Sequence, residues 1–72
     1  MAVSYKPLFK LLIDKNMKKK DLAEKAGISL ATITKMGREG TTVTTDVLAR
    51  ICGALGCSIS DIVEVIPEVH HD

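Results

Sequence analysis

Apolar residues recur three or four positions apart in four separate stretches of this chain, a spacing that predicts amphipathic α-helices. In the first stretch, Leu8, Leu11 and Leu12 share one side of the helix. Ser4 can cap this helix, which we expect to run to about Asn16. Each predicted helix is apolar along one side only, so the helices should bury those sides against one another. The single Tyr and Phe and the absence of Trp make the expected core aliphatic.

The second stretch predicts a helix over residues 18–26 that ends at a glycine. Leu22, Ala23 and Ala26 form its apolar stripe. Gly27 follows directly, and glycine adopts the left-handed conformation of a helix C-terminus at little cost. We therefore expect a sharp turn at this residue.

The third stretch starts a few residues later and predicts a helix from Leu30 to about Arg38. Ser29 can cap it by accepting a hydrogen bond from a free N–H of the first turn. Ile33 and Met36 give it one buried edge. Two short helices joined by a glycine-containing turn form a helix-turn-helix, whose second helix can enter the major groove of DNA. The pattern therefore favours a DNA-binding domain.

Thr44 or Thr45 should cap a fourth helix, which Gly56 ends. Its buried stripe consists of Leu48, Ile51, Cys52 and Leu55. Ser58 and Asp61 then resemble a capping pair for a short fifth helix. The expected fold is all-α, a compact five-helix bundle.

Both ends of the chain also carry sequence typical of strands. Residues 62–66 are rich in β-branched side chains and are closed by Pro67, and residues 2–5 form the only other segment of this kind. The two segments could pair into a short terminal β-ribbon. Alternatively, residues 65–69 could pair with, or pack on, a second subunit.

Length and composition limit what this protein can be. With 72 residues and 46% apolar side chains, we expect a single domain over residues 1–72, with a core at about 4–66 and a tail at 67–72. No apolar run approaches the roughly 18 residues of a membrane helix, and no signal-peptide h-region is present. The expected location is therefore cytoplasmic, without membrane contact.

Two cysteines and two histidines raise the question of a metal site. The spacing of Cys52 and Cys57, with His70 and His71 adjacent at a chain end, matches no tetrahedral zinc pattern. We therefore expect no metal and no cofactor, and reduced, buried thiols. The chain also lacks a Ser/His/acid set and a glycine-rich phosphate loop, which argues against an enzyme.

Charge is divided unevenly along the chain. Residues 1–40 hold nine Lys and Arg against four Asp and Glu, a net charge of +5. Residues 41–72 hold one Arg against five Asp and Glu, a net charge of −4. A run of like charge is usually a solvated face, but here the positive half contains the helix-turn-helix. This coincidence favours contact with phosphates.

Helical geometry indicates which side chains of the third helix face outward. With its buried edge in the core, a rotation of about 100° per residue directs Ala31 and Arg38 outward. Lys35 and Thr34 flank them, and Leu30 lies at the margin. Ala31, the Thr34 methyl and Leu30 suit thymine methyl groups. Lys35 can donate to guanine O6 and N7, and Arg38 can meet a phosphate. Leu30 could equally belong to the core, and Thr34 could be an ordinary surface residue.

Three lysines at the start of the second helix break a local rule. Lys18, Lys19 and Lys20 occupy its cap and first turn, where the helix dipole disfavours cations by roughly 0.3–1 kcal/mol each. An anionic partner would reverse the sign of this cost. Such an uncompensated choice often marks function, so we predict phosphate contacts here. The alternative is a solubilising surface.

By these residues the chain resembles the phage repressor and Cro family of helix-turn-helix domains, called XRE-like. The similarity covers about residues 8–64 and is strongest in the segments DLAEKAGIS and VLARICGALGCSISDI. The chain is also similar to the small VanU-type regulators of glycopeptide-resistance gene clusters. The resemblance implies a lambda-repressor-like five-helix bundle that binds operator DNA, usually as a homodimer.

The resemblance also implies particular contact residues. The family's base-reading positions fall on Leu30, Ala31 and Lys35, with Ser29 and Thr34 beside them. Its phosphate contact at the start of the second helix falls on Lys19. Glutamine or asparagine is common at the first base-reading position, and this chain has Leu30 and Ala31 there. Either recognition uses methyl contacts and DNA shape, or specificity is modest.

Sequence and resemblance together predict a transcriptional regulator that binds double-stranded DNA as a homodimer through its third helix. It would repress or activate a promoter. The alternative is a protein-interaction module, such as an antitoxin-like subunit, which the apolar residues 63–69 would support.

Overall fold

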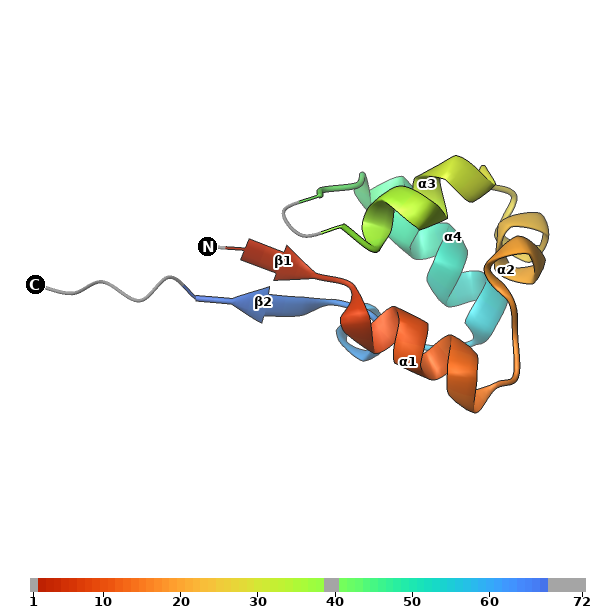
Figure 1. The fold of residues 1–72 in the computed structure, drawn as a ribbon, viewed down its shortest axis with the longest axis horizontal. Coiled ribbons are helices and arrows are strands. Elements are labelled where there is room, and N and C mark those ends of the chain that lie inside the picture. Colours follow the sequence, from red (N-terminus) through yellow and green to blue (C-terminus); the bar gives the residue numbers. More distant parts are fainter. Residues whose placement is uncertain (1, 39–40, 68–72) are drawn as a thin grey trace, which may run out of the picture.

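The computed structural model describes residues 2–38 and 41–67. In chain order the elements are β1 (Ala2–Ser4), α1 (Lys6–Asp14), α2 (Lys19–Ala26), α3 (Leu30–Met36), α4 (Thr45–Leu55), the 3-10 turn η1 (Ile59–Asp61) and β2 (Glu64–Ile66). The ribbon of β1 and β2 projects from one end of the helical bundle (Figure 1). Most of the predicted tail, with His70 and His71, lies outside the described residues.

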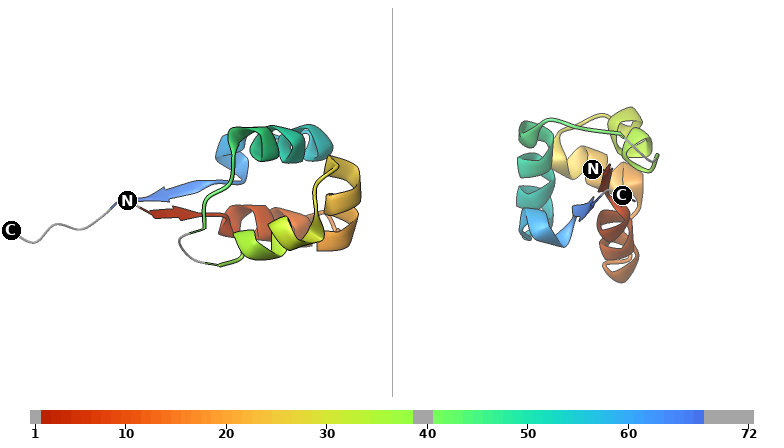
Figure 2. Two further views of the ribbon diagram at one scale, coloured as in Figure 1. Left: turned by 90° about the horizontal axis from the view of Figure 1, so that it is seen from above. Right: turned by 90° about the vertical axis from the view of Figure 1, so that its left-hand side faces the viewer.

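The four helices surround one core. α3 and α1 lie on one side of the bundle and α4 on the other, while α2 closes the end opposite the ribbon (Figure 2). The largest fully buried side chains are Leu8, Leu22, Ile33, Met36, Ile51 and Ile62. Each such burial is worth about 1.5–3 kcal/mol, so the predicted apolar stripes supply most of the force that holds the helices together.

The predicted caps fix the start of α3 and α4. Ser29 Oγ accepts a hydrogen bond from the Thr32 N–H at 3.1 Å, and Thr44 Oγ1 accepts one from the Val47 N–H at 3.4 Å. Each bond satisfies an N–H that has no partner within its helix. Of the two threonines predicted as the cap of α4, the structure uses Thr44.

Two glycines end helices in the left-handed region. Gly27 has a φ of 69° and Gly56 a φ of 64°, which reverses the chain after α2 and after α4. A side chain would cost roughly 1–2 kcal/mol in this conformation. Both predicted helix ends are confirmed.

The limits predicted for α1 and α3 need correction. α1 ends at Asp14, because Asn16 takes a φ of 55°, which a helix cannot accommodate. Tyr5 occupies the cap position, although Ser4 Oγ accepts a hydrogen bond from the Lys6 N–H at 3.2 Å. α3 ends at Met36, short of the expected Arg38.

The predicted fifth α-helix is a single 3-10 turn, so the described residues contain four α-helices. The capping pair is present: the Ser58 N–H donates to Asp61 Oδ2 at 2.9 Å. Ile62 then leaves the helical conformation with a φ of −120° and is fully buried. Inserting this side chain into the core ends the turn and turns the chain toward β2.

The two strand-like ends do pair with each other. β1 and β2 are antiparallel, with Ala2 opposite Ile66, Val3 opposite Val65 and Ser4 opposite Glu64. A two-stranded ribbon has two open edges, and among the described residues no third strand covers them. The bundle is thus mostly helical with a small β-ribbon.

Candidate nucleic-acid interface

The outer side of α3 presents the side chains predicted to face outward. Its inner edge is anchored by Ile33 and Met36, which are 0% and 2% exposed. The outer residues are all exposed. They line one surface hollow of about 440 Å³, which is formed by Leu30, Ala31, Thr34, Lys35 and Arg38. Leu30 is 47% exposed, so it lies at the surface rather than in the core.

Ser29 is placed differently from the other predicted base-reading residues. Its hydroxyl caps α3 and also lies 2.8 Å from the Thr32 hydroxyl. This local network engages the Ser29 side chain in the turn. Its clearest role in the structure is therefore to orient the first turn of α3, and Thr32 shares that role without having been singled out from the sequence.

The three lysines at the start of α2 are exposed, and two of them have specific local contacts. The Lys18 N–H donates to Asp21 Oδ2 at 3.1 Å, which satisfies the helix start and brings a carboxylate to its positive end. Lys19 Nζ lies 5.1 Å from the centre of the Phe9 ring, a cation–π contact that reduces the freedom of this side chain. Asp21 thus offsets part of the predicted electrostatic cost.

The structure brings these lysines to the start of α3. Lys18, Lys19 and Lys20 line a groove together with Leu30 and Thr34. Arg38 lies apart from them, at the other end of α3, where it lines a hollow beside the β-ribbon. Cationic side chains therefore flank the outer side of α3 at both ends, an arrangement that suits a ligand carrying a row of negative charges.

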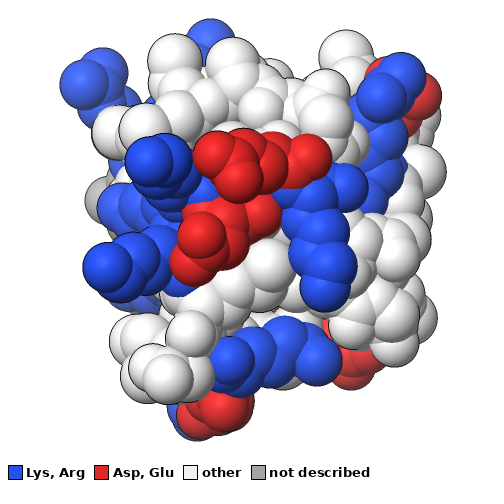
Figure 3. Space-filling model, turned by 90° about the vertical axis from the view of Figure 1, so that its right-hand side faces the viewer, with Lys and Arg blue, Asp and Glu red and all other residues white. Residues whose placement is uncertain are grey.

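Charge on the end of the molecule formed by α2 is not uniformly positive. Basic side chains lie on both sides of a smaller acidic patch (Figure 3). In sequence, Asp21 and Glu24 of α2 lie between Lys20 and Lys25. A partner that fits this end must therefore match a pattern of charges rather than net charge alone.

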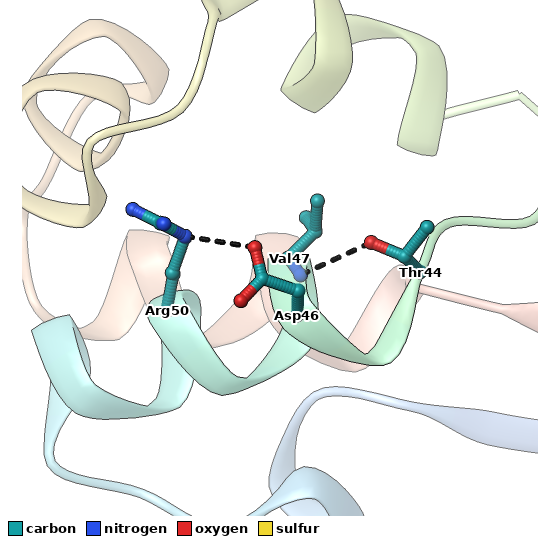
Figure 4. Close-up of polar contacts among 4 residues, drawn as sticks. All are labelled: Thr44, Asp46, Val47 and Arg50. Atoms are coloured by element: carbon teal, nitrogen blue, oxygen red, sulfur yellow. Dashed lines mark hydrogen bonds and ion pairs between the residues drawn. The ribbon is translucent and has the colours of Figure 1, made fainter.

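Sequence reasoning missed Arg50, which α4 brings to the turn between α2 and α3. Its Nε donates to Asp46 Oδ2 at 3.0 Å, and its guanidinium points toward the turn (Figure 4). One terminal nitrogen is 3.6 Å from the place where a Cβ on Gly27 would stand. The i, i+4 spacing with Asp46 could have indicated the ion pair, but nothing local indicates the approach to Gly27.

The two cysteines lie near each other at the end of α4. Cys52 and Cys57 are free thiols, both partly buried. Burial and the neighbouring Cys52 raise the pKa of Cys57 above its usual 9.0, so its thiol stays protonated near neutral pH and is a poor nucleophile. Within residues 2–38 and 41–67, no group of three or more His, Cys, Asp or Glu could hold a metal ion.

No helix in the described part of the chain has the length and apolarity needed to cross a bilayer.

Known proteins share this sequence pattern and this fold. A model of the Cro/C1-type helix-turn-helix DNA-binding domain matches residues 8–68. The crystal structure of the transcriptional regulator VanUg, form II, is similar with a TM-score of 0.82 and 46% sequence identity, covering 93% of this chain and 88% of that chain. No curated protein sequence matches. Both resemblances inferred from the sequence are confirmed.

Proposed function

We propose, since the chain belongs to the Cro/C1-type helix-turn-helix family of DNA-binding domains, that it regulates transcription by placing α3 in the major groove of operator DNA. The similarity to the transcriptional regulator VanUg supports a regulatory role. The observation that carries the proposal is the hollow on the outer side of α3, because every residue that lines it was expected to meet DNA.

In this proposal the first half of α3 reads bases. Ala31, Leu30 and the Thr34 methyl contact thymine methyl groups, and Lys35 donates to guanine O6 and N7. All four side chains are exposed. Ser29 lies beside them and contributes chiefly by orienting the first turn.

Phosphate contacts come from both sides of α3. Lys18, Lys19 and Lys20 meet the backbone at the start of α2, where the free N–H groups of the helix also attract an anion. Arg38 meets the backbone near the end of α3. Each neutralised phosphate releases counterions, so binding should weaken steeply as salt concentration rises.

The functional unit in this proposal is a homodimer that uses the β-ribbon. Val3 and Ile66 share a hollow with Met36 and Arg38, so the ribbon lies beside the C-terminal end of α3. Val65 and Ile66 are 53% and 40% exposed. A two-fold axis at the ribbon would point the base-reading ends of two α3 helices outward, toward successive major grooves about 34 Å apart. Antiparallel pairing of β2 with β2 of the second copy would also cover one open edge of each ribbon.

Selection of bound duplexes from a random pool tests this function. The wild-type protein should enrich an inverted repeat whose half-sites lie about one helical turn apart. Selection with Lys35→Ala should give the same repeat with relaxed preference at one base pair per half-site, by about 1–3 kcal/mol. Base reading by α3 would be contradicted if the wild-type protein enriched no sequence. It would also be contradicted if Lys35→Ala kept the full preference at every base pair.

The proposal also gives the protein no catalytic role and a cytoplasmic location, where its DNA target would be. A protein-interaction role is the second candidate, and one surface of the molecule favours it specifically.

A further inference from the structure

An apolar groove lies beside the proposed DNA-binding side of α3. It has a volume of about 570 Å³ and runs between α1, the segment before α2 and the start of α3. Its apolar lining consists of Phe9, Leu12, Ile13, Met17 and Leu30. Ile13 is 78% exposed and Leu30 is 47% exposed, and both are large side chains that the core does not use.

The stability of the fold does not explain this surface. Ile13 belongs to the last turn of α1, where a polar side chain would satisfy the helix equally well. A partner that covers Ile13 removes its exposed apolar surface from water and so gains affinity. A contiguous apolar surface with a charged rim is typical of an interaction site.

The rim of the groove has one sign of charge. Lys18, Lys19 and Lys20 all line it, and no acidic side chain from residues 2–38 or 41–67 does. From this complementarity we propose that the groove binds an acidic amphipathic helix of another protein. The apolar side of that helix lies on Ile13, Met17 and Leu30, and its carboxylates pair with the three lysines. Helix-in-groove recognition of this kind uses apolar anchors at i, i+3 or i+4, and i+7.

A protein helix fits this groove better than DNA does. Duplex DNA matches the lysine rim, but it offers little apolar surface apart from thymine methyl groups. The apolar lining of the groove, with its aromatic ring, thioether and branched aliphatic groups, would therefore lie against a poorly matched surface. An acidic amphipathic helix matches the rim and the lining together.

This partner would compete with DNA, a consequence that rests on the function proposed above. Lys18, Lys19 and Lys20 belong both to the groove and to the proposed phosphate contacts, and Leu30 and Thr34 belong to the proposed base-reading set. One occupant excludes the other. The groove is thus a site at which a second protein releases the regulator from its operator.

A displayed library of random helical peptides, selected against the whole chain, tests the site. The enriched peptides should be acidic with apolar residues at helical spacing. Ile13→Ser should lower the affinity of a labelled enriched peptide at least tenfold in fluorescence anisotropy. The matched control Ile59→Ser removes an exposed isoleucine from η1 and should leave that affinity unchanged.

A separate arm uses the duplex selected above as competitor. The enriched peptide should release the labelled duplex, and Ile13→Ser should bind the duplex as the wild type does. The site would be overturned if the enriched peptides were neutral or basic, if they bound Ile13→Ser equally well, or if no peptide were enriched.

If Ile13→Ser instead loses DNA affinity tenfold, DNA covers the groove and the proposal is wrong. A peptide that binds without releasing the duplex overturns the competition. If no duplex is bound at all, the proposed function fails while the peptide arm still tests the groove.

Discussion

Gly27 and Gly53 both have room for a Cβ, but only Gly27 has a backbone conformation that favours glycine. Gly27 has a φ of 69°, and a Cβ there would meet Arg50 only at an ordinary contact distance of 3.6 Å. Gly53 lies inside α4, where a Cβ would meet nothing within 4 Å. The cost of a side chain at Gly27 is therefore conformational, and at Gly53 there is no such cost.

We expect Gly27→Ala to lower the free energy of unfolding by about 1–2 kcal/mol, because an L-residue resists the left-handed region. Gly53→Ala should raise it by about 0.5–1 kcal/mol, because glycine is a poor residue inside a helix. Urea unfolding of the two variants measures both changes. Equal stability of the two variants would contradict the assignment of the turn.

Asp61 makes the stability of η1 depend on pH. Its hydrogen bonds from the backbone N–H and the hydroxyl of Ser58 lower the pKa of this carboxyl below its ordinary 3.8. A lowered pKa in the folded state adds stability above the ordinary pKa, and this stability is lost as pH falls through the folded-state pKa. Asp61→Asn should therefore melt below the wild type at a pH of about 7.

The difference in melting temperature between the two proteins should shrink as pH falls below 3.8, because the wild-type carboxyl takes up a proton and loses this contribution. Thermal unfolding followed by circular dichroism gives both comparisons. A difference in melting temperature that is as large in acid as at neutral pH would show that the charge of Asp61 does not contribute.

Among the elements, the start of α2 carries the proposed phosphate contacts. Lys19→Ala together with Lys20→Ala should weaken binding to all duplexes similarly and reduce the slope of log K against log salt by up to about two. The matched control is Lys10→Ala together with Lys15→Ala. Both lysines line a hollow between α1 and the end of α4. Fluorescence anisotropy across a salt series should show a nearly unchanged slope for this control. Equal slopes for the two double variants would refute the phosphate assignment.

The elements also show what sequence alone could predict. The stripes around Leu8, Leu22, Ile33 and Ile51 identified four helices, because burial imposes a helical period that is visible locally. η1 was expected as a helix, since the Ser58–Asp61 pair caps a 3-10 turn as well as an α-helix. Nothing in the local pattern shows that Ile62 enters the core at that point.

Contacts between distant parts of the chain were harder to predict. Pairing of β1 with β2 was only one of two alternatives, since β-branched residues indicate a strand but not its partner. The outer side of α3 follows from its own periodicity and was predicted in detail. The approach of Arg50 to Gly27 and the exposed groove at Ile13 depend on how separate helices pack, so only the structure reveals them.

At the scale of the whole molecule, the proposed homodimer predicts a concentration-dependent mass. Val65→Glu puts a charge on the exposed part of β2 and should shift sedimentation toward the monomer and lower operator affinity. Ile13→Glu makes the same chemical change at the opposite end of the bundle, and self-association should persist. If Val65→Glu sediments as the wild type does, the ribbon is not the dimer contact.

In the proposed complex, one side of this molecule, made by α3 and the start of α2, lies against DNA. Amide chemical shifts recorded by NMR during titration with the selected duplex test it most directly. The largest changes should occur at residues 30–35 and 18–20, with little change along the pocket between α1 and the end of α4 that Leu11 and Leu55 line. Changes centred on that pocket, with α3 unaffected, would contradict it.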